Sequence, residues 1–202
     1  MADSTVFLID DDASFLTATT RLLRGLGYSV KPFESAKAFL KEISPADQGC
    51  VVADLQMPDF SGLDLQKALA ATENPLPIIF LTGHGDIPST VKAMRGGAED
   101  FLTKRAAKEE LVAAIQRALA RDYLEREKRA RLRELRGRFA TLTDREVEVM
   151  RHVVRGEMNK QIAADLGINE RTVKLHRTNL TRKLRAPSVA ELTRIAQEIG
   201  LT

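Results

Sequence analysis

One stretch of the chain decides the N-terminal fold: from Cys50 to Gly62 it reads Cys-Val-Val-Ala-Asp-Leu-Gln-Met-Pro-Asp-Phe-Ser-Gly. A short apolar run bounded by turn-forming residues is typical of a buried β-strand. Asp54 ends this run, so we expect its carboxylate at the carboxyl end of a strand. In an open parallel α/β sheet, ligands bind at that edge. Asp54 is therefore either a structural cap or a functional carboxylate, and the other strand ends decide between the two.

Residues 1–120 alternate between strand-like and helix-like patterns. Apolar residues recur at helical spacing between the strands, as Phe15, Ala18 and Leu22 do before Gly27. Five β–α units predict an α/β domain with a parallel sheet and helices on both faces. Asp86 is expected to begin a helix, and Gly27 and Gly97 to end helices in the left-handed conformation. The predicted strands are residues 5–9, 29–32, 50–53, 78–81 and 100–102.

Charge is distributed unevenly over the 202 residues, whose net charge is +3. Residues 1–120 carry 12 basic and 16 acidic side chains, residues 121–138 carry 8 and 4, and residues 139–202 carry 11 and 8. This asymmetry predicts that a polyanionic partner would bind the C-terminal part. The single Cys50 cannot form an intramolecular disulfide, and neither a signal peptide nor a membrane span is evident. We therefore expect a soluble, cytoplasmic protein.

Residues 121–138 form a basic connector without proline. Four acid–base pairs at i, i+4 each add about 0.2–0.5 kcal/mol to an exposed helix. They are Asp122–Arg126, Glu125–Arg129, Glu127–Arg131 and Glu134–Arg138. We predict a helix that continues from Leu111 and is either a solvated charged helix or, with an imperfect heptad pattern, a dimeric coiled coil.

Residues 139–202 have a purely helical pattern. Capping boxes at Thr143–Glu146 and Ser188–Glu191 each predict the start of a helix. Asn159 and Asn169 are predicted N-caps of two further helices. The turn Gly167-Ile168-Asn169 between those two helices gives the layout of a helix-turn-helix. The pattern predicts a four-helix domain.

Several strand ends carry groups that suit phosphate chemistry. The first predicted strand ends in Asp10 and Asp11, the third in Asp54 and the fourth in Thr82, and Lys104 follows the fifth. Clustered carboxylates repel one another unless cations balance them, so these residues predict a Mg²⁺ site. Mg²⁺ bridges carboxylate and phosphate oxygens, while a lysine and a hydroxyl can bind the remaining oxygens. The combination is suited to forming an acyl phosphate on Asp54.

On these motifs, residues 1–120 resemble a two-component receiver domain, which has the flavodoxin-like fold of CheY. The resemblance implies that Asp54 accepts a phosphoryl group from a kinase phosphohistidine. It implies that Lys104 contacts the phosphoryl oxygens and that Thr82 and Phe101 are the switch residues. The Mg²⁺ ligands implied by the resemblance are Asp11, Asp54 and the backbone carbonyl of Gln56, with Asp10 acting through water.

One position departs from the family pattern. The family usually has a cis Lys-Pro peptide, but Arg105 follows Lys104 here. A cis bond before a non-proline residue costs about 2.5–4 kcal/mol, so the loop either bears that strain or has a trans peptide. Gln56 and His84 stand at positions that in this family face the acceptor. We expect them to tune the lifetime of the phosphate, although His84 could equally be an ordinary loop histidine.

Residues 170–185 form the most basic predicted helix. A charged stripe alone is most often solvent-facing, but three segments resemble the LuxR-type helix-turn-helix: Leu142–Glu146, Asn159–Ala163 and Thr172–His176. The resemblance implies that Lys174, Leu175 and Thr178 enter the major groove and read bases. Phosphate contacts, which fix register but not sequence, would come from six other residues. These are Asn159, Lys160, Thr172, Arg177, Arg182 and Lys183.

Over its whole length the chain resembles a response regulator of the FixJ or NarL type. The resemblance implies a receiver over residues 1–120, a basic helical linker over 121–138 and a DNA-binding domain over 139–202. It implies DNA, a sensor histidine kinase and RNA polymerase as partners, with homodimers forming on activation. The chain would then be a phosphorylation-controlled transcription factor and not an enzyme.

Two other interpretations remain open at this point. Asp10-Asp11-Asp12-Ala13-Ser14 superficially resembles the nucleophile motif of haloacid-dehalogenase phosphatases, which would make Asp10 the nucleophile, but no cap domain is evident. Alternatively, the receiver could serve as a dimer module of a transcription factor that acts without phosphorylation, an option that Arg105 keeps open.

Overall fold

The computed structural model describes residues 4–58, 60–83 and 87–201. The chain divides into two units, Met1–Arg126 and Glu127–Thr202. The first unit contains a sheet of five parallel strands in the order β2-β1-β3-β4-β5. The strands are β1 (Thr5–Ile9), β2 (Ser29–Phe33), β3 (Gly49–Asp54), β4 (Ile78–Thr82) and β5 (Asp100–Thr103). The predicted sheet is confirmed, with β1 at its predicted bounds and the other strands longer by one residue at one or both ends.

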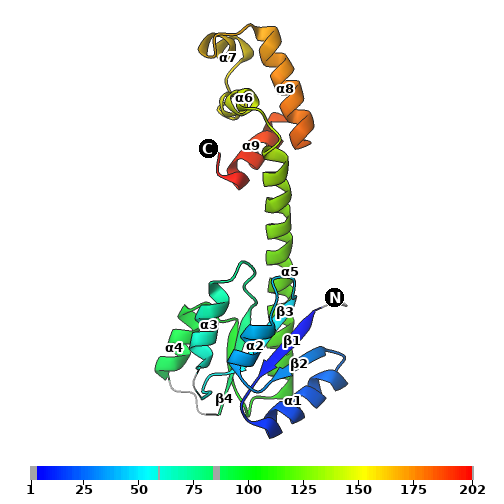
Figure 1. The fold of residues 1–202 in the computed structure, drawn as a ribbon, viewed down its shortest axis with the longest axis vertical. Coiled ribbons are helices and arrows are strands. Elements are labelled where there is room, and N and C mark those ends of the chain that lie inside the picture. The colour runs from blue at the N-terminus through cyan, green and yellow to red at the C-terminus, as the bar shows by residue number, and fades with distance from the viewer. Residues whose placement is uncertain (1–3, 59, 84–86, 202) are drawn as a thin grey trace. The chain divides into compact units, whose positions relative to one another are not determined.

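Two apolar layers cover the sheet, because side chains alternate along each strand. Val6 and Leu8 of β1 pack toward α1 (Ala13–Gly25) and α5 (Lys108–Phe139). Phe7 and Ile9 pack in the other layer, with the three helices on the opposite face (Figure 1). Those helices are α2 (Ala36–Glu42), α3 (Gly62–Ala70) and α4 (Ile87–Arg95). Every residue of β3 and β4 is buried, as expected for central parallel strands.

Short polar side chains begin the helices that border the carboxyl edge of the sheet. The Asp12 carboxylate accepts hydrogen bonds from the backbone of Ser14 and Phe15 at the start of α1, and the Ser61 hydroxyl caps α3. Gly27 and Gly97 have φ values of 90° and 88°, which confirms their predicted left-handed conformation. The predicted cap Asp86 lies outside the described residues.

Helix α5 has 32 residues and includes the whole predicted connector, so the helical linker is confirmed. The pairs Asp122–Arg126 and Glu134–Arg138 are present. Asp122 is nevertheless buried, contrary to the expectation of an exposed helix, because its carboxylate accepts a hydrogen bond from the backbone N–H of Gly49 (3.0 Å). Arg131 pairs with Glu198, which is far away in the sequence (2.9 Å).

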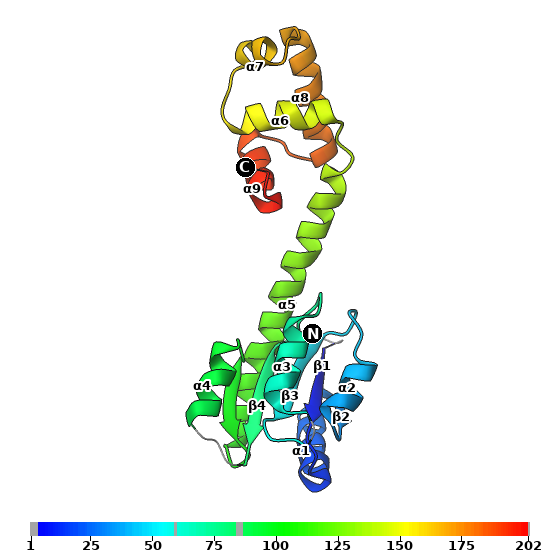
Figure 2. The same cartoon turned by 60° about the vertical axis from the view of Figure 1, so that its left-hand side comes forward.

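The second unit packs its helices around one apolar core. Helices α6 and α7 both contact α8, and α6 also contacts α9 (Figure 2). Leu135 of α5 joins this core together with Val149, Ile162, Leu180 and Ile195. The bounds are α6 (Asp144–Val154), α7 (Asn159–Asp165), α8 (Glu170–Leu184) and α9 (Val189–Ile199). This confirms the predicted four-helix arrangement.

The predicted caps of the second unit are partly confirmed. Thr143 and Glu146 form the expected capping box, and Asn169 caps α8. The prediction that Asn159 is an N-cap is wrong. Met158 occupies that position, its N–H donates to the Gln161 side chain (2.8 Å), and the Asn159 side chain instead accepts a hydrogen bond from Arg177. Ser188 caps α9, whereas the carboxylate of Glu191 pairs with Arg194. Within the described ranges, none of the helices has the length and apolar character needed to cross a bilayer.

Candidate functional site

The strand register brings the predicted acidic residues together at one edge of the sheet. Ile9 of β1 pairs with Ala53 of β3, so the next residues along the two strands, Asp10 and Asp54, lie side by side. Carboxylate oxygens of Asp10, Asp11 and Asp54 all lie within 4.8 Å of one another. Asp10 and Asp54 are buried, whereas Asp11 is exposed. The edge therefore presents an acidic pocket, defined by these three aspartates, that is open on the side of Asp11.

Lys104 supplies the positive charge of the acidic pocket. Its Nζ lies 2.7 Å from Asp10 Oδ2 and 2.8 Å from Asp54 Oδ2. Its backbone N–H donates to the Thr82 carbonyl (2.8 Å), which extends the pairing of β4 and β5 by one residue. The peptide bond between Lys104 and Arg105 is trans. Of the two alternatives for the Lys104–Arg105 peptide, cis or trans, the trans form is present. The Lys104 ammonium reaches both carboxylates without a cis peptide.

Burial and pairing act in opposite directions on the charges of this pocket. Burial raises the pKa of Asp10 above its ordinary value, although the hydrogen bond from Lys104 opposes the change. Burial also disfavours the charged form of Lys104, but hydrogen bonds to Asp10 and Asp54 outweigh it, and the pKa of Lys104 is raised. Lys104 therefore stays an ammonium, and the pocket has a permanent cation beside Asp54.

Backbone contacts explain the roles of Gln56 and Gly62 in the stretch that follows Asp54. The N–H of Gln56 donates to Asp54 Oδ1 (3.2 Å), so the turn orients the carboxylate. The N–H of Gly62 donates to the Leu55 carbonyl (3.0 Å), and a Cβ at Gly62 would lie only 2.6 Å from the Asp54 carbonyl oxygen. Glycine is required there because the chain passes so close to the strand end.

The two predicted switch residues lie on the neighbouring strands β4 and β5. Thr82 ends β4 and is fully buried. Phe101 of β5 is half-buried, and its ring centroid lies 6.3 Å from that of Phe80. His84 lies outside the described residues, so its expected tuning role stays a prediction.

Phe15 is a residue of this site that the sequence did not reveal. Lys104 Nζ lies 4.7 Å from the centroid of the Phe15 ring, within the range of a cation–π interaction. The helical spacing of apolar residues assigned Phe15 to the core. A signal in the sequence could have placed Phe15 at the carboxyl edge of the sheet: it lies in the first turn of the first helix, four residues after Asp11.

In the second unit, α8 presents the predicted DNA-contacting residues unevenly. Val173, Leu180 and Leu184 are buried, which turns the opposite side of the helix outward. Lys174, Leu175, Thr178 and Arg182 are exposed on α8, as is Lys160 on α7. Asn159, Thr172, Arg177 and Lys183 are half-buried. The Arg177 guanidinium donates to the Asn159 side chain (2.7 Å), so these two predicted contacts form one joint group between α7 and α8.

Lys183 makes contacts that set it apart from its neighbours. Its Nζ lies 2.7 Å from Glu146 Oε2 and 3.0 Å from the Thr141 carbonyl oxygen. Burial disfavours the charged form of Glu146, but the hydrogen bond from Lys183 outweighs this and lowers the pKa of Glu146. Lys183 therefore links α8 to the start of α6, and its predicted phosphate contact stays untested.

Known proteins share both units. Residues 6–116 match the response regulator receiver domain, and residues 140–196 match the bacterial regulatory proteins of the luxR family. The chain is 42% identical to the response regulator protein TodT of Pseudomonas putida over 97% of this chain and 86% of that protein. It is 44% identical to nodulation protein W of Bradyrhizobium diazoefficiens, over 98% and 87% of the two chains. The solved structure of the response regulator StyR is 42% identical, with a TM-score of 0.87 over 97% of this chain and 99% of that one.

A CheY-like receiver joined to a LuxR-type helix-turn-helix defines a two-component response regulator that controls transcription. The chain belongs to this class and, within it, to the FixJ/NarL family. It is a transcription regulator and not an enzyme, so the phosphatase interpretation of Asp10 is dropped. Receiver domains generally bind Mg²⁺ at an acidic pocket, and the three aspartates form such a pocket here.

Proposed function

We propose that a sensor histidine kinase phosphorylates Asp54 and that this controls dimerisation and sequence-specific DNA binding. One observation carries the proposal: the Lys104 ammonium lies within 3 Å of both Asp10 and Asp54. A carboxylate that is next to a fixed cation, at the ligand-binding edge of the sheet, is placed to accept a phosphoryl group. The kinase phosphohistidine would lose its P–N bond as an Asp54 oxygen forms the new P–O bond.

The acidic pocket fits Mg²⁺ by its chemistry, because all its side-chain ligands are carboxylate oxygens. Asp11, Asp54 and the backbone carbonyl of Gln56 would hold the ion directly, with Asp10 acting through water. Bound Mg²⁺ would neutralise charge on the phosphoryl oxygens. Lys104 would pair with a phosphoryl oxygen, and the hydroxyl of Thr82 would bind another while the Phe101 ring changes rotamer.

We propose the same domain assignment as the sequence indicates: receiver 1–120, linker 121–138 and DNA-binding domain 139–202. Lys174, Leu175 and Thr178 would read bases, because all three are exposed on α8. Phosphate contacts would come from Asn159, Lys160, Thr172, Arg177 and Arg182, with Lys183 the weakest candidate since Glu146 already binds it. The protein would act in the cytoplasm and would engage RNA polymerase at its promoters.

The alternative is a transcription factor whose receiver acts as a dimer module without phosphorylation. Arg105 was the reason for considering it. The trans peptide after Lys104 favours the phosphorylated mechanism, because Lys104 reaches both carboxylates despite the missing proline.

The test compares oligomeric state and DNA affinity of the wild type with those of Asp54→Ala, with and without acetyl phosphate and Mg²⁺. Asp64→Asn serves as the matched control, because it changes a half-exposed carboxylate of the same unit that is not one of the three aspartates of the acidic pocket. We expect wild type and Asp64→Asn to dimerise and bind DNA more tightly on treatment, and Asp54→Ala to respond to neither. An equal response in all three proteins would remove Asp54 from the mechanism, whereas dimers and tight DNA binding that treatment leaves unchanged in all three would support the phosphorylation-independent alternative.

A further inference from the structure

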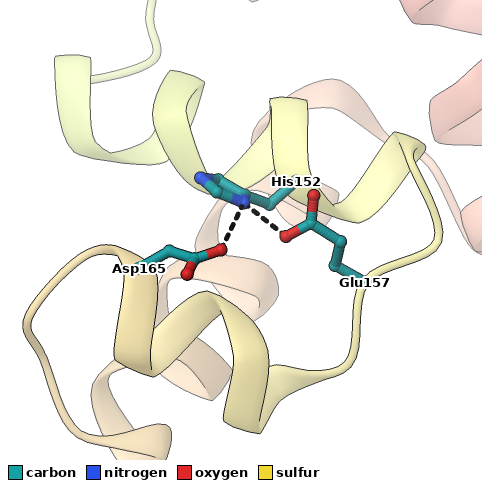
Figure 3. A group of neighbouring side chains, drawn as sticks. All are labelled: His152, Glu157 and Asp165. Atoms are coloured by element: carbon teal, nitrogen blue, oxygen red, sulfur yellow. Dashed lines mark hydrogen bonds and ion pairs between the residues drawn. The ribbon is translucent and has the colours of Figure 1, made fainter.

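A second group of metal-ligating side chains lies in the DNA-binding unit. His152 comes from the last turn of α6, Glu157 from the turn after it, and Asp165 from the end of α7. Both carboxylates point at the imidazole (Figure 3). The His152 Nδ1 atom lies 2.6 Å from Glu157 Oε2 and 3.8 Å from Asp165 Oδ2. One nitrogen and two oxygen ligands, from three separate segments, therefore converge within 4.8 Å.

The contacts of His152 Nδ1 conflict with one another. Arg155 Nη2, which can only donate, lies 3.0 Å from this nitrogen, and Glu157 Oε2, which can only accept when ionised, lies on it as well. If Nδ1 carries a proton, it donates to Glu157 and repels the Arg155 N–H. If it carries a lone pair, it accepts from Arg155 and faces the charged oxygen of Glu157. A cation on the lone pair resolves the conflict, because it attracts the imidazole and both carboxylates together.

The charges around the group favour a divalent cation. Two carboxylates and one guanidinium lie around the imidazole, so acidic groups outnumber basic ones beside it. Arg155 Nε binds Glu157 Oε1 (2.9 Å), which leaves Oε2 available for a metal. The Arg155 side chain is exposed, so its Nη2 atom, which contacts His152, can turn into solvent when the ion binds.

We propose that His152 Nδ1, Glu157 and Asp165 bind a divalent transition-metal ion of the zinc class. Mixed imidazole and carboxylate ligands suit Zn²⁺, whereas Mg²⁺ and Ca²⁺ take oxygen ligands. Tetrahedral bonds of about 2.0–2.2 Å to Zn²⁺ set neighbouring ligand atoms roughly 3.3–3.6 Å apart. The 2.6 Å contact must open and the 3.8 Å contact must close, each by less than about 1 Å, which side-chain rotation achieves. Water would complete the coordination at the exposed side of Asp165.

The site has a structural consequence for the DNA-binding unit. Glu157 and Asp165 bracket the short helix α7 and the segment Met158–Lys160, which includes predicted phosphate contacts. A metal bound to both ends would fasten α7 to α6. Binding to the folded state alone also stabilises that state by mass action. This proposal is independent of phosphorylation at Asp54.

The test is a calorimetric titration of chelator-treated full-length protein with ZnCl₂. Excess Mg²⁺ is present so that the acidic pocket of Asp10, Asp11 and Asp54 does not take up the zinc. We expect one Zn²⁺ per chain, and an affinity at least about tenfold lower in His152→Gln and in Asp165→Asn. His176→Gln is the matched control: it removes the histidine of α8 and should bind zinc like the wild type.

A spectroscopic measurement reports on the ligands themselves. Co²⁺ in place of Zn²⁺ should give the visible absorption of a four-coordinate nitrogen and oxygen site in the wild type and in His176→Gln, but not in His152→Gln. Circular dichroism checks that each variant is folded. Zinc affinity that is unchanged in His152→Gln, or lowered equally in His176→Gln, would overturn the proposal. If His152→Gln does not fold, unchanged zinc affinity in Asp165→Asn, whose altered side chain is exposed, would overturn it as well.

Discussion

The acidic pocket and the basic helix α8 present charge in opposite ways. In the pocket, Asp10 and Asp54 are buried and bind Lys104, so the candidate functional groups contact one another. On α8, Lys174 and Arg182 are exposed, whereas Lys183 is paired with Glu146. Most charges of the acidic pocket are thus buried, with Asp11 exposed at its open side, whereas the predicted DNA-contacting charges Lys174 and Arg182 of α8 face outward. The exceptions in each region, Phe15 and Lys183, are where the comparison can be tested.

The largest expected effect concerns Lys104, the cation of the acidic pocket. Lys104→Ala should slow phosphorylation of Asp54 by acetyl phosphate about 10²–10³-fold, because it removes the preorganised cation next to the acceptor. Lys108→Ala, which changes a solvent-exposed lysine at the start of α5, should have no such effect. Stopped-flow kinetics would measure both rates. Equal rates in the two variants would show that the contacts of Lys104 are only structural.

Two neighbouring basic residues of α8, Arg182 and Lys183, should differ in how much they contribute to the stability of the folded protein. Lys183→Ala leaves the buried Glu146 carboxylate without its cation, so we expect a loss of roughly 1–3 kcal/mol in the free energy of unfolding. Arg182→Ala changes an exposed side chain and should alter this quantity by at most about 0.5 kcal/mol. Urea unfolding would measure both. Similar losses would mean that the pairing of Lys183 does not distinguish it from its neighbour.

The exposed residues of α8 should divide into base-reading and phosphate-binding groups. Lys174→Ala should cost roughly 1–3 kcal/mol of DNA-binding energy at one base pair only. Arg182→Ala should weaken binding to all sites alike and reduce the salt slope by about 1. Binding titrations with single-base operator variants at several salt concentrations would measure these effects. A uniform loss in Lys174→Ala would assign Lys174 to the phosphate-binding group.

The smallest effect is expected at Phe15. A cation–π contact at a partly exposed site contributes about 0.5–1 kcal/mol, so Phe15→Leu should slow phosphorylation by acetyl phosphate about two- to fivefold. Phe15→Tyr keeps an aromatic face and should retain the wild-type rate. If the leucine variant matches the tyrosine variant, Phe15 only fills the core.

The sequence predicted what depends on local pattern. The strands, to within one residue at each end, the left-handed glycines and the Thr143 capping box follow from short-range spacing and are confirmed. The parallel topology also predicted that four charged residues would meet at one edge of the sheet: Asp10, Asp11, Asp54 and Lys104.

The features that the sequence did not reveal depend on contacts between distant residues. Asp122 is buried because Gly49, 73 residues earlier, donates to it, and Lys183 is paired because Glu146 lies beneath it. Asn159 is not an N-cap because α7 already begins at this residue, and its side chain binds Arg177, 18 residues later. No local pattern encodes such pairs. For the same reason, the approach of Asp165 to His152 could be found only in the structure.

The most direct test of the central claim locates the phosphoryl group chemically. Full-length protein is incubated with acetyl phosphate and Mg²⁺, the acyl phosphate is reduced with borohydride, and peptides are mapped by mass spectrometry. Reduction converts a phosphorylated aspartate into homoserine. We predict homoserine at position 54 alone, and none in Asp54→Ala. Homoserine at Asp10 or Asp11, or at no position in the wild type, would contradict the assignment of Asp54 as the acceptor.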